Sequence, residues 1–472
     1  MNFKSSWELR AKFAQSLSTM YGKEVPAYNT LVEVSTKVNE EYLRRHGAAA
    51  ERLGSINRVT AERHGAIRVG SEREMSQVAR VFAAFGMYPV GFYDLRDASS
   101  SAVPVVSTAF RPIDTDELAK NPFRVFTSML AVEDPRFFSL DLQKELTAFF
   151  DKRELFGDEL LELSDRAAAD GGLAGPEADR LLELATAAFE LSADPVDHDW
   201  YRRLEAISAV ASDIGGVTST HINHLTPRVL DIDALYSGME SLGIKMIDEI
   251  QGPPGWDGPD VLLRQTSFKA LGEERLFRHA DGSIKPGELR VRFGEVEARG
   301  IALTPAGRDV YDRMVAEVDN RLNESPGQAR QEIARAVWEE NLPRTEAELA
   351  AKGLAFFTFA AHPEKLSGAQ TGPVTLAELI ATGAAVPQPI VYEDFLPRSA
   401  AGIFQSNLAD EGSKNEAERA ADYDIHRMTR IVGREVRDPY ELYQAQQDAS
   451  VAEISAALGV EIVPDAVVVS AS

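Results

Sequence analysis

The chain has 472 residues and a formal charge of −24, with 44% apolar residues, 8% aromatic residues and no cysteine. This length exceeds what one hydrophobic core usually supports, and the composition is too apolar for a disordered protein. Without cysteine there is no disulfide, zinc–thiolate site or iron–sulfur cluster, so a metal ion would need histidine and carboxylate ligands. The negative charge argues against nucleic acid or an anionic membrane as a partner, and an anionic substrate would need a local arginine.

A cytoplasmic location is predicted from two absences in the sequence. The first residues do not combine a basic stretch with an apolar run, as a signal peptide would. No window reaches the roughly 18 consecutive apolar residues of a membrane-spanning helix.

The first third of the chain predicts helices followed by a unit of mixed strand and helix. Apolar residues recur at helical spacing up to about residue 60, and we assign 1–55 to N-terminal helices. Ser71 and Glu74 form a capping-box pattern that opens a helix, which Gly86 ends. Strand-like runs surround this helix, so 56–135 is interpreted as a βαβββ unit. Its predicted strands are 61–69, 87–94, 103–110 and 123–132.

The rest of the chain predicts an insertion, a second βαβββ unit and a mixed tail. The apolar spacing of an acidic region at 136–212 predicts helices, and we interpret this region as an insertion that covers another part of the protein. The second unit, 213–304, has a helix ended by Gly243 and is followed by a mixed region, 305–472, that packs on the core. Its predicted strands are 217–226, 244–250, 261–269 and 288–303. The fold class is therefore α+β, a curved sheet of paired βαβββ units with helical additions.

The two units place one histidine each in the same register. His64 precedes Gly86 by the same number of residues as His221 precedes Gly243. Strand alternation puts His64, Ala66 and Arg68 on one face of the first strand, and it separates His221 from His224 in the other unit. His224 competes with His221, and the shared register favours His221.

Glu295 is the predicted carboxylate partner of these histidines. It lies on a predicted strand whose same face carries Glu297 and Arg299. If the polar faces line the concavity of the sheet, His64, His221 and Glu295 meet at one point. Two histidines and one carboxylate on one face of a six-coordinate metal suit Fe(II) and leave three positions open, enough for a 2-oxo acid and O2. Alternatively, Glu295 and Glu297 form a solvated strand face.

Four segments resemble the 2-oxoadipate dioxygenase/decarboxylase family, over about residues 8–462. They are Glu62-Arg-His-Gly-Ala-Ile-Arg68, Thr220-His-Ile-Asn-His-Leu-Thr-Pro-Arg228, Phe293-Gly-Glu-Val-Glu-Ala-Arg-Gly300, and Glu393-Asp-Phe-Leu-Pro with Ser399-Ala-Ala-Gly-Ile-Phe-Gln-Ser406. The second and third also resemble strands of vicinal-oxygen-chelate modules, as in the hydroxyphenylpyruvate dioxygenases and hydroxymandelate synthase.

The resemblance implies oxidative decarboxylation of 2-oxoadipate to D-2-hydroxyglutarate and CO2, with Fe(II) and O2, in lysine catabolism. It implies metal binding by His64, His221 and Glu295 and substrate binding by Arg68 and Ser399. The sequence departs from the family pattern at Arg398, where a small apolar residue is expected. This departure bears on the shape of the pocket wall near Ser399.

Arg68 also suits a dicarboxylic substrate on physical grounds. The Cα atoms of Arg68 and His64 lie about 13 Å apart along the strand. The arginine side chain can reach back over about half of this distance. A guanidinium binds a carboxylate through two parallel hydrogen bonds. Alternatively, Arg68 pairs with a neighbouring Asp or Glu.

Two other functions remain open from the sequence. One is a glyoxalase-like metal-dependent isomerase or lyase that consumes no oxygen, and the other is a non-catalytic carboxylate-binding protein. Oxygen uptake separates the dioxygenase from both alternatives, and metal content separates the two enzymes from the binding protein.

Overall fold

The computed structural model describes residues 3–55, 62–97, 103–270, 272–289, 292–325, 327–366, 373–397, 403, 407, 414 and 418–463. Both helices and strands build this part of the chain, which confirms the α+β class. None of the helices in these ranges combines the length and apolar character needed to cross a membrane.

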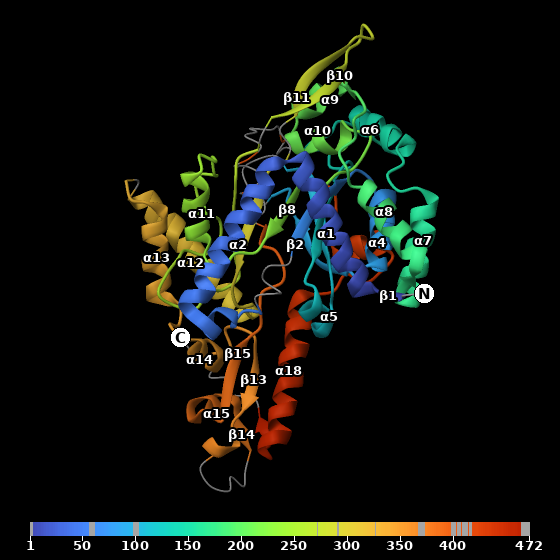
Figure 1. Ribbon diagram of the computed structural model, residues 1–472. Helices are drawn as coiled ribbons and strands as arrows, with labels where there is room; N and C mark the ends of the chain where they lie inside the picture. Colours follow the sequence, from blue (N-terminus) through green and yellow to red (C-terminus); the bar gives the residue numbers. More distant parts are fainter. Residues whose placement is uncertain are drawn as a thin grey trace.

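Two long N-terminal helices, α1 (Ser6–Glu24) and α2 (Pro26–His46), lie across the central sheet (Figure 1). Leu9, Phe13 and Tyr21 of α1 are fully buried in one apolar cluster with Ile67 and Val69 of the sheet. The predicted N-terminal helices are therefore present, and they cover one face of the sheet.

The first βαβββ unit forms as predicted. Its helix α4 (Glu72–Ala84) begins at Ser71, whose hydroxyl accepts a hydrogen bond from the backbone N–H of Glu74. Gly86 follows the helix with a φ of 65°, a left-handed conformation that glycine adopts without strain. The strands are β2 (Glu62–Val69), β3 (Tyr88–Asp94), β4 (Val105–Arg111) and β5 (Arg124–Leu130).

The second unit joins the first through strand β8 (His224–Pro227), which pairs antiparallel with β2 at the edge of a five-stranded sheet of order β3-β4-β5-β2-β8. Just beyond β8, Arg228 forms a parallel bridge with Glu297 of β12 (Glu295–Arg299). Strand β12 in turn pairs with β9 (Leu263–Ser267). This arrangement brings β12 close to β2, although more than 200 residues separate the two strands in the sequence.

The second unit is less regular than the sequence predicts. Its helix α11 (Ile232–Ser241) ends just before Gly243, as predicted, but strand β8 begins at His224 instead of residue 217. The predicted strand 244–250 is reduced to a bridge at Met246, with a second bridge at Gln251 just beyond it. Of the predicted strand 288–303, the structure retains β12 in the middle and the last two residues of β11 at its start. β11 (Ile284–Leu289) forms a hairpin with β10 (Glu273–Arg278), which was not predicted and projects at the top of Figure 1.

The insertion and the C-terminal region are helical and mixed, respectively. The insertion contains α6 (Leu140–Lys152), α7 (Asp158–Asp170), α8 (Gly175–Ala187), α9 (His198–Glu205) and α10 (Ala209–Gly215), with the short strands β6 (Gly172–Ala174) and β7 (Val196–Asp197). β6 pairs with the N-terminal strand β1 (Phe3–Ser5). The C-terminal region contains α12 (Pro305–Glu324), α13 (Arg330–Asn341), α14 (Glu346–Ala351), β13 (Phe357–Ala361), β14 (Val374–Thr375), α15 (Leu376–Thr382), β15 (Ala385–Pro389), α17 (Ile425–Val432), α18 (Pro439–Leu458) and β16 (Ile462–Val463). It forms its own apolar cluster around the fully buried Trp338.

A buried ion pair fastens the insertion to the first unit. Arg153, just after α6, donates to both oxygens of Glu74 at 2.8 and 2.7 Å and to the carbonyls of Ile214 and Val217. Removing one partner leaves the other charge buried and uncompensated.

We predict that Arg153→Ala lowers the free energy of unfolding by about 3–5 kcal/mol, because Glu74 then remains buried without its cation. The midpoint of urea unfolding measures this change. Arg180→Ala is the matched control, since Arg180 pairs with Glu159 on the surface and its loss should leave the midpoint unchanged. Equal midpoints for Arg153→Ala and the wild type would contradict the prediction.

Candidate metal centre

Strand β2 presents alternate residues to opposite sides of the sheet, as its sequence predicts. Ala66 packs with Phe126 and Phe395 in one apolar cluster, whereas Ile67 and Val69 belong to the cluster under α1. His64 and Arg68, two residues on either side of Ala66, therefore face the side of the sheet away from α1.

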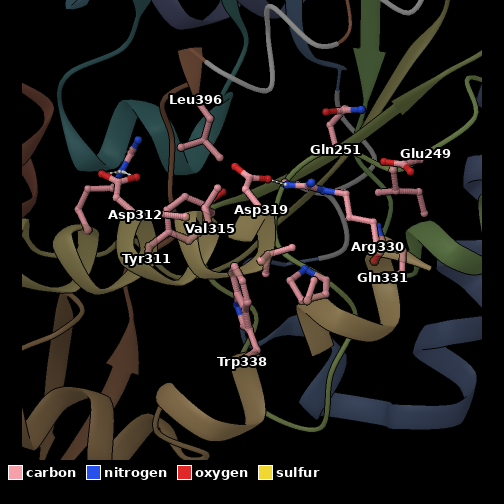
Figure 2. A pocket seen from close by; sticks show the side chains of 17 residues that line it. Glu249, Gln251, Tyr311, Asp312, Val315, Asp319, Arg330, Gln331, Trp338 and Leu396 are labelled. Atoms are coloured by element: carbon pink, nitrogen blue, oxygen red, sulfur yellow. Dashed lines mark hydrogen bonds and ion pairs between the residues drawn. The ribbon is translucent and has the colours of Figure 1, made fainter. Parts of the chain in front are cut away.

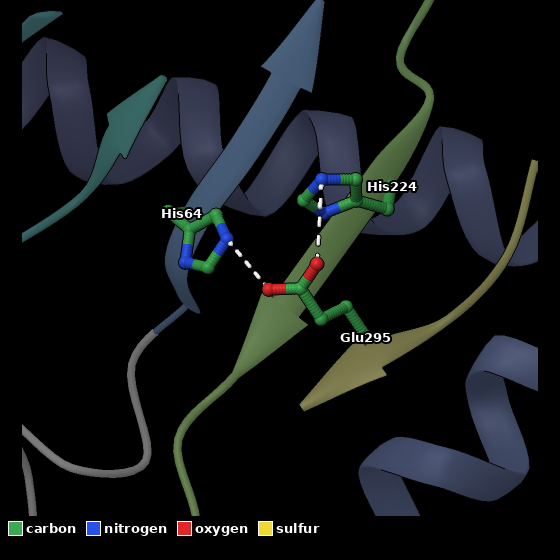
Figure 3. A group of neighbouring side chains, drawn as sticks. All are labelled: His64, His224 and Glu295. Carbon is green, nitrogen blue, oxygen red and sulfur yellow. Dashed lines mark ion pairs between the residues drawn. The ribbon is translucent and has the colours of Figure 1, made fainter. Parts of the chain in front are cut away.

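Three side chains from three strands converge on one point (Figure 3). His64 of β2, His224 of β8 and Glu295 of β12 turn toward one another, and one ligand atom of each lies within 4.8 Å of the others. His64 Nε2 is 3.2 Å from Glu295 Oε1, and His224 Nε2 is 3.6 Å from Glu295 Oε2. All three residues are buried. Two imidazoles and one carboxylate are the donor set of mononuclear iron oxygenases.

A side-chain oxygen lies close to the second ring nitrogen of each histidine. His64 Nδ1 lies 2.9 Å from Glu297 Oε2, and His224 Nδ1 lies 3.0 Å from the hydroxyl of Thr226. Metal-binding histidines usually engage their other nitrogen in this way, because the contact fixes the orientation of the ring. Both Nε2 atoms are thereby directed toward Glu295.

Among the buried carboxylates of the described residues, Glu295 differs in having no arginine partner. Each of the others pairs with an arginine; they are Glu74, Asp134, Asp213, Glu297, Glu393 and Asp394. Across the described ranges, Glu295 has no Lys or Arg partner and contacts His64, His224 and the amide of Gln265. Because a buried charge without a cation is costly, a metal cation fits this position as the missing positive charge.

The protonation states also suit a metal. Burial lowers the pKa of His224 to about 4. The charge of Glu295 opposes this shift, whereas the charges of His64 and Arg68 add to it. Burial opposes ionisation of Glu295, but the two imidazoles hold the pKa of its carboxyl below the usual value. Burial also opposes protonation of His64, yet Glu297 and Glu295 outweigh it and raise the pKa of that ring. A metal that binds Nε2 of His64 would therefore displace a proton.

The predicted ligand His221 does not belong to this group. Its Nε2 lies 3.2 Å from Asp213 Oδ1 of α10 and accepts a hydrogen bond from the amide of Asn223 at 3.1 Å. The structure thus groups His64 with His224 rather than with the predicted His221.

The structure differs from the prediction in where this strand begins. The backbone N–H of Ile222 donates to the carbonyl of Phe189, outside the sheet, and strand β8 starts only two residues later. The alternation assumed for 217–226 therefore does not apply to His221.

The two predicted substrate-binding residues have different outcomes. The guanidinium of Arg68 forms a buried ion pair with Asp213, which is the alternative that the sequence left open. Its positive charge reaches the metal group, since it contributes to the lowered pKa of His224. Ser399 and Arg398 lie outside the described residues.

A separate cavity of about 290 Å³ lies between α12, α13 and the segment 249–254 (Figure 2). Two ion pairs border it, Arg308–Asp312 and Arg330–Asp319. Its wall includes Leu396, but none of the three residues of the metal group. The cavity is therefore distinct from that group.

Comparison with known proteins gives consistent matches over nearly the whole chain. A family model described as 2-oxoadipate dioxygenase/decarboxylase matches residues 13–407. A protein of that name from Mycobacterium tuberculosis is 54% identical over 93% of this chain and 96% of its own length, and one from Pseudomonas putida is 39% identical over 97% and 98%. The crystal structure of the hydroxyglutarate synthase from Pseudomonas putida in complex with 2-oxoadipate superposes with a TM-score of 0.81, at 36% identity, over 98% of this chain and 100% of that one.

We predict that His224→Ala weakens metal binding by more than roughly 100-fold, because loss of a ligand should exceed the 10- to 100-fold cost of losing an outer partner. His221→Ala should change the affinity only a few-fold. Titration of the metal-free protein with Co(II), followed by absorption, measures both. A large loss in His221→Ala with wild-type affinity in His224→Ala would contradict the assignment.

Proposed function

The chain belongs to the 2-oxoadipate dioxygenase/decarboxylase family, and from this premise we propose that it converts 2-oxoadipate and O2 to D-2-hydroxyglutarate and CO2 with Fe(II) as its metal. The observation that carries the proposal is the convergence of His64, His224 and Glu295 in a buried site. These three residues are the proposed ligands, in place of the set with His221.

The donor set supports iron as the proposed metal. Fe(II) bound by two histidines and one carboxylate supplies three open positions, at which a 2-oxo acid and O2 react. His64 and His224 both direct Nε2 toward the carboxylate of Glu295, and Glu295 supplies the negative charge.

The proposed reaction needs no further reactant. The carbon skeleton loses one carboxyl group as CO2, and both atoms of O2 enter the products, one in the new carboxylate and one in the 2-hydroxyl group. Atoms balance between 2-oxoadipate with O2 and 2-hydroxyglutarate with CO2. Since 2-oxoadipate supplies the electrons, the protein needs to bind and orient one organic substrate only.

Arg68 is the proposed partner of the distal carboxylate of 2-oxoadipate. It is buried on the same face of β2 as His64, and Asp213 orients its guanidinium. In a protein with a net charge of −24, such a fixed positive charge is a specific attraction for a dianionic substrate.

Aromatic side chains around the metal group support chemistry in a dry site. The ring of Phe395 meets His64 edge to face at 5.0 Å, and Phe293 stacks on His224 at 5.3 Å. These rings keep bulk water from the ligands, which strengthens electrostatic interactions within the site.

We predict that the iron-loaded protein consumes one O2 for each 2-oxoadipate and that the product carries label from isotopically labelled O2. One labelled atom should appear in the new carboxylate and one in the 2-hydroxyl group, apart from exchange with water. An oxygen electrode and mass spectrometry measure the two results. Turnover without oxygen uptake would instead support a glyoxalase-like isomerase or lyase.

We predict that Arg68→Lys raises KM for 2-oxoadipate, because lysine keeps the charge but loses the planar fork. Loss of this interaction costs about 1.5–3 kcal/mol, or roughly 10- to 150-fold. A 2-oxo acid of the same length without the distal carboxylate is the control, since wild type and variant should handle it alike. Unchanged KM for 2-oxoadipate would show that another residue binds the distal carboxylate.

A further inference from the structure

We infer that Glu297 is a positioning residue for the metal centre, and that Arg299 and the distant segment 392–394 hold it in place. This inference rests on the metal site proposed above. It concerns how the chain fixes one ligand, His64, and it assigns a role to a buried chain of charged groups that does not itself contact the metal.

Glu297 is the residue that fixes the ring of His64. Its Oε2 lies 2.9 Å from Nδ1 of His64, and its side chain is fully buried. It lies two residues after Glu295 on β12, so strand alternation directs both carboxylates to the same side. One carboxylate contacts Nε2 of His64 and the other Nδ1, and the imidazole is thereby held from both ends.

Arg299 fixes Glu297 in turn. It donates from Nε to Glu297 Oε1 at 2.7 Å and from Nη2 to Glu297 Oε2 at 2.8 Å. Its Nη1 donates to the carbonyl oxygens of Tyr392 and Asp394 at 2.8 and 2.9 Å. A guanidinium held by this many directed hydrogen bonds is rigid, and it leaves the carboxylate little freedom to rotate.

The segment 392–394, whose carbonyls accept hydrogen bonds from Arg299, is itself held by buried charged groups. The carboxylate of Asp394 accepts hydrogen bonds from Arg111 of β4 at 2.8 and 3.1 Å and from the hydroxyl of Tyr443 of α18. The neighbouring Phe395 contacts the ring of His64. The C-terminal region thus reaches His64 twice, through an aromatic contact and through the chain Asp394, Arg299 and Glu297.

The two proposed histidine ligands are held differently. His64 is oriented by a carboxylate, whereas His224 is oriented by the uncharged hydroxyl of Thr226. A carboxylate partner raises the basicity of an imidazole ligand as well as fixing its direction. Loss of the partner should therefore cost more at His64 than at His224.

The test measures Co(II) binding by the full-length protein, with Co(II) as a spectroscopic substitute for Fe(II). Glu297→Gln keeps the size of the side chain and removes its charge. We expect the Kd for Co(II) to rise about 10- to 100-fold, with a changed visible absorption spectrum of the bound ion. Arg299→Lys should change both in the same direction, and Thr226→Val should raise the Kd only a few-fold.

Glu74→Gln is the matched control, because Glu74 is an equally buried carboxylate that pairs with Arg153 and does not contact the metal group. Its midpoint of unfolding should fall while its affinity and spectrum stay at wild-type values. Wild-type affinity and spectrum in Glu297→Gln would overturn the inference, and so would an equal loss of affinity in Glu74→Gln. Undiminished binding by His64→Ala would instead overturn the metal site itself.

Discussion

The arrangement of the centre follows from one constraint, that a carboxylate removed from water needs positive charge beside it. Elsewhere in the described interior, arginine meets this need, as in the pairs Glu74–Arg153 and Asp394–Arg111. At Glu295 two imidazoles take the place of arginine, and the lowered pKa of His224 leaves at least one of them neutral. A divalent cation bound by all three side chains would satisfy the same constraint.

The same constraint organises the parts of the chain around the centre. Strand β2 comes from the first βαβββ unit, whereas β8 and β12 come from the second, so the group lies where the two units meet. Helix α10 contributes Asp213 to Arg68, and the C-terminal region contributes the carbonyls that hold Arg299. Regions that are separate in sequence are therefore joined by buried polar contacts to the strands that carry the proposed ligands.

The sequence predicted those features that depend on local pattern. The cap at Ser71 and the left-handed Gly86 both follow from neighbouring residues. His64 and Glu295 lie on β2 and β12, which form within the strand ranges that the sequence predicted. His221 was preferred to His224 because it shares its register with His64, whereas the structure groups His64 with His224. The contacts of the segment before β8, from Ile222 to Phe189 and from His221 to Asp213, have no signal in the strand pattern.

The central claim is that one iron ion is bound between His64, His224 and Glu295. Diffraction from crystals of the iron-loaded protein, measured on both sides of the iron absorption edge, locates such an ion directly. The account predicts a single anomalous peak at this point, about 2.0–2.2 Å from two Nε2 atoms and a carboxylate oxygen. A peak beside His221 and Asp213, with none at Glu295, would contradict it.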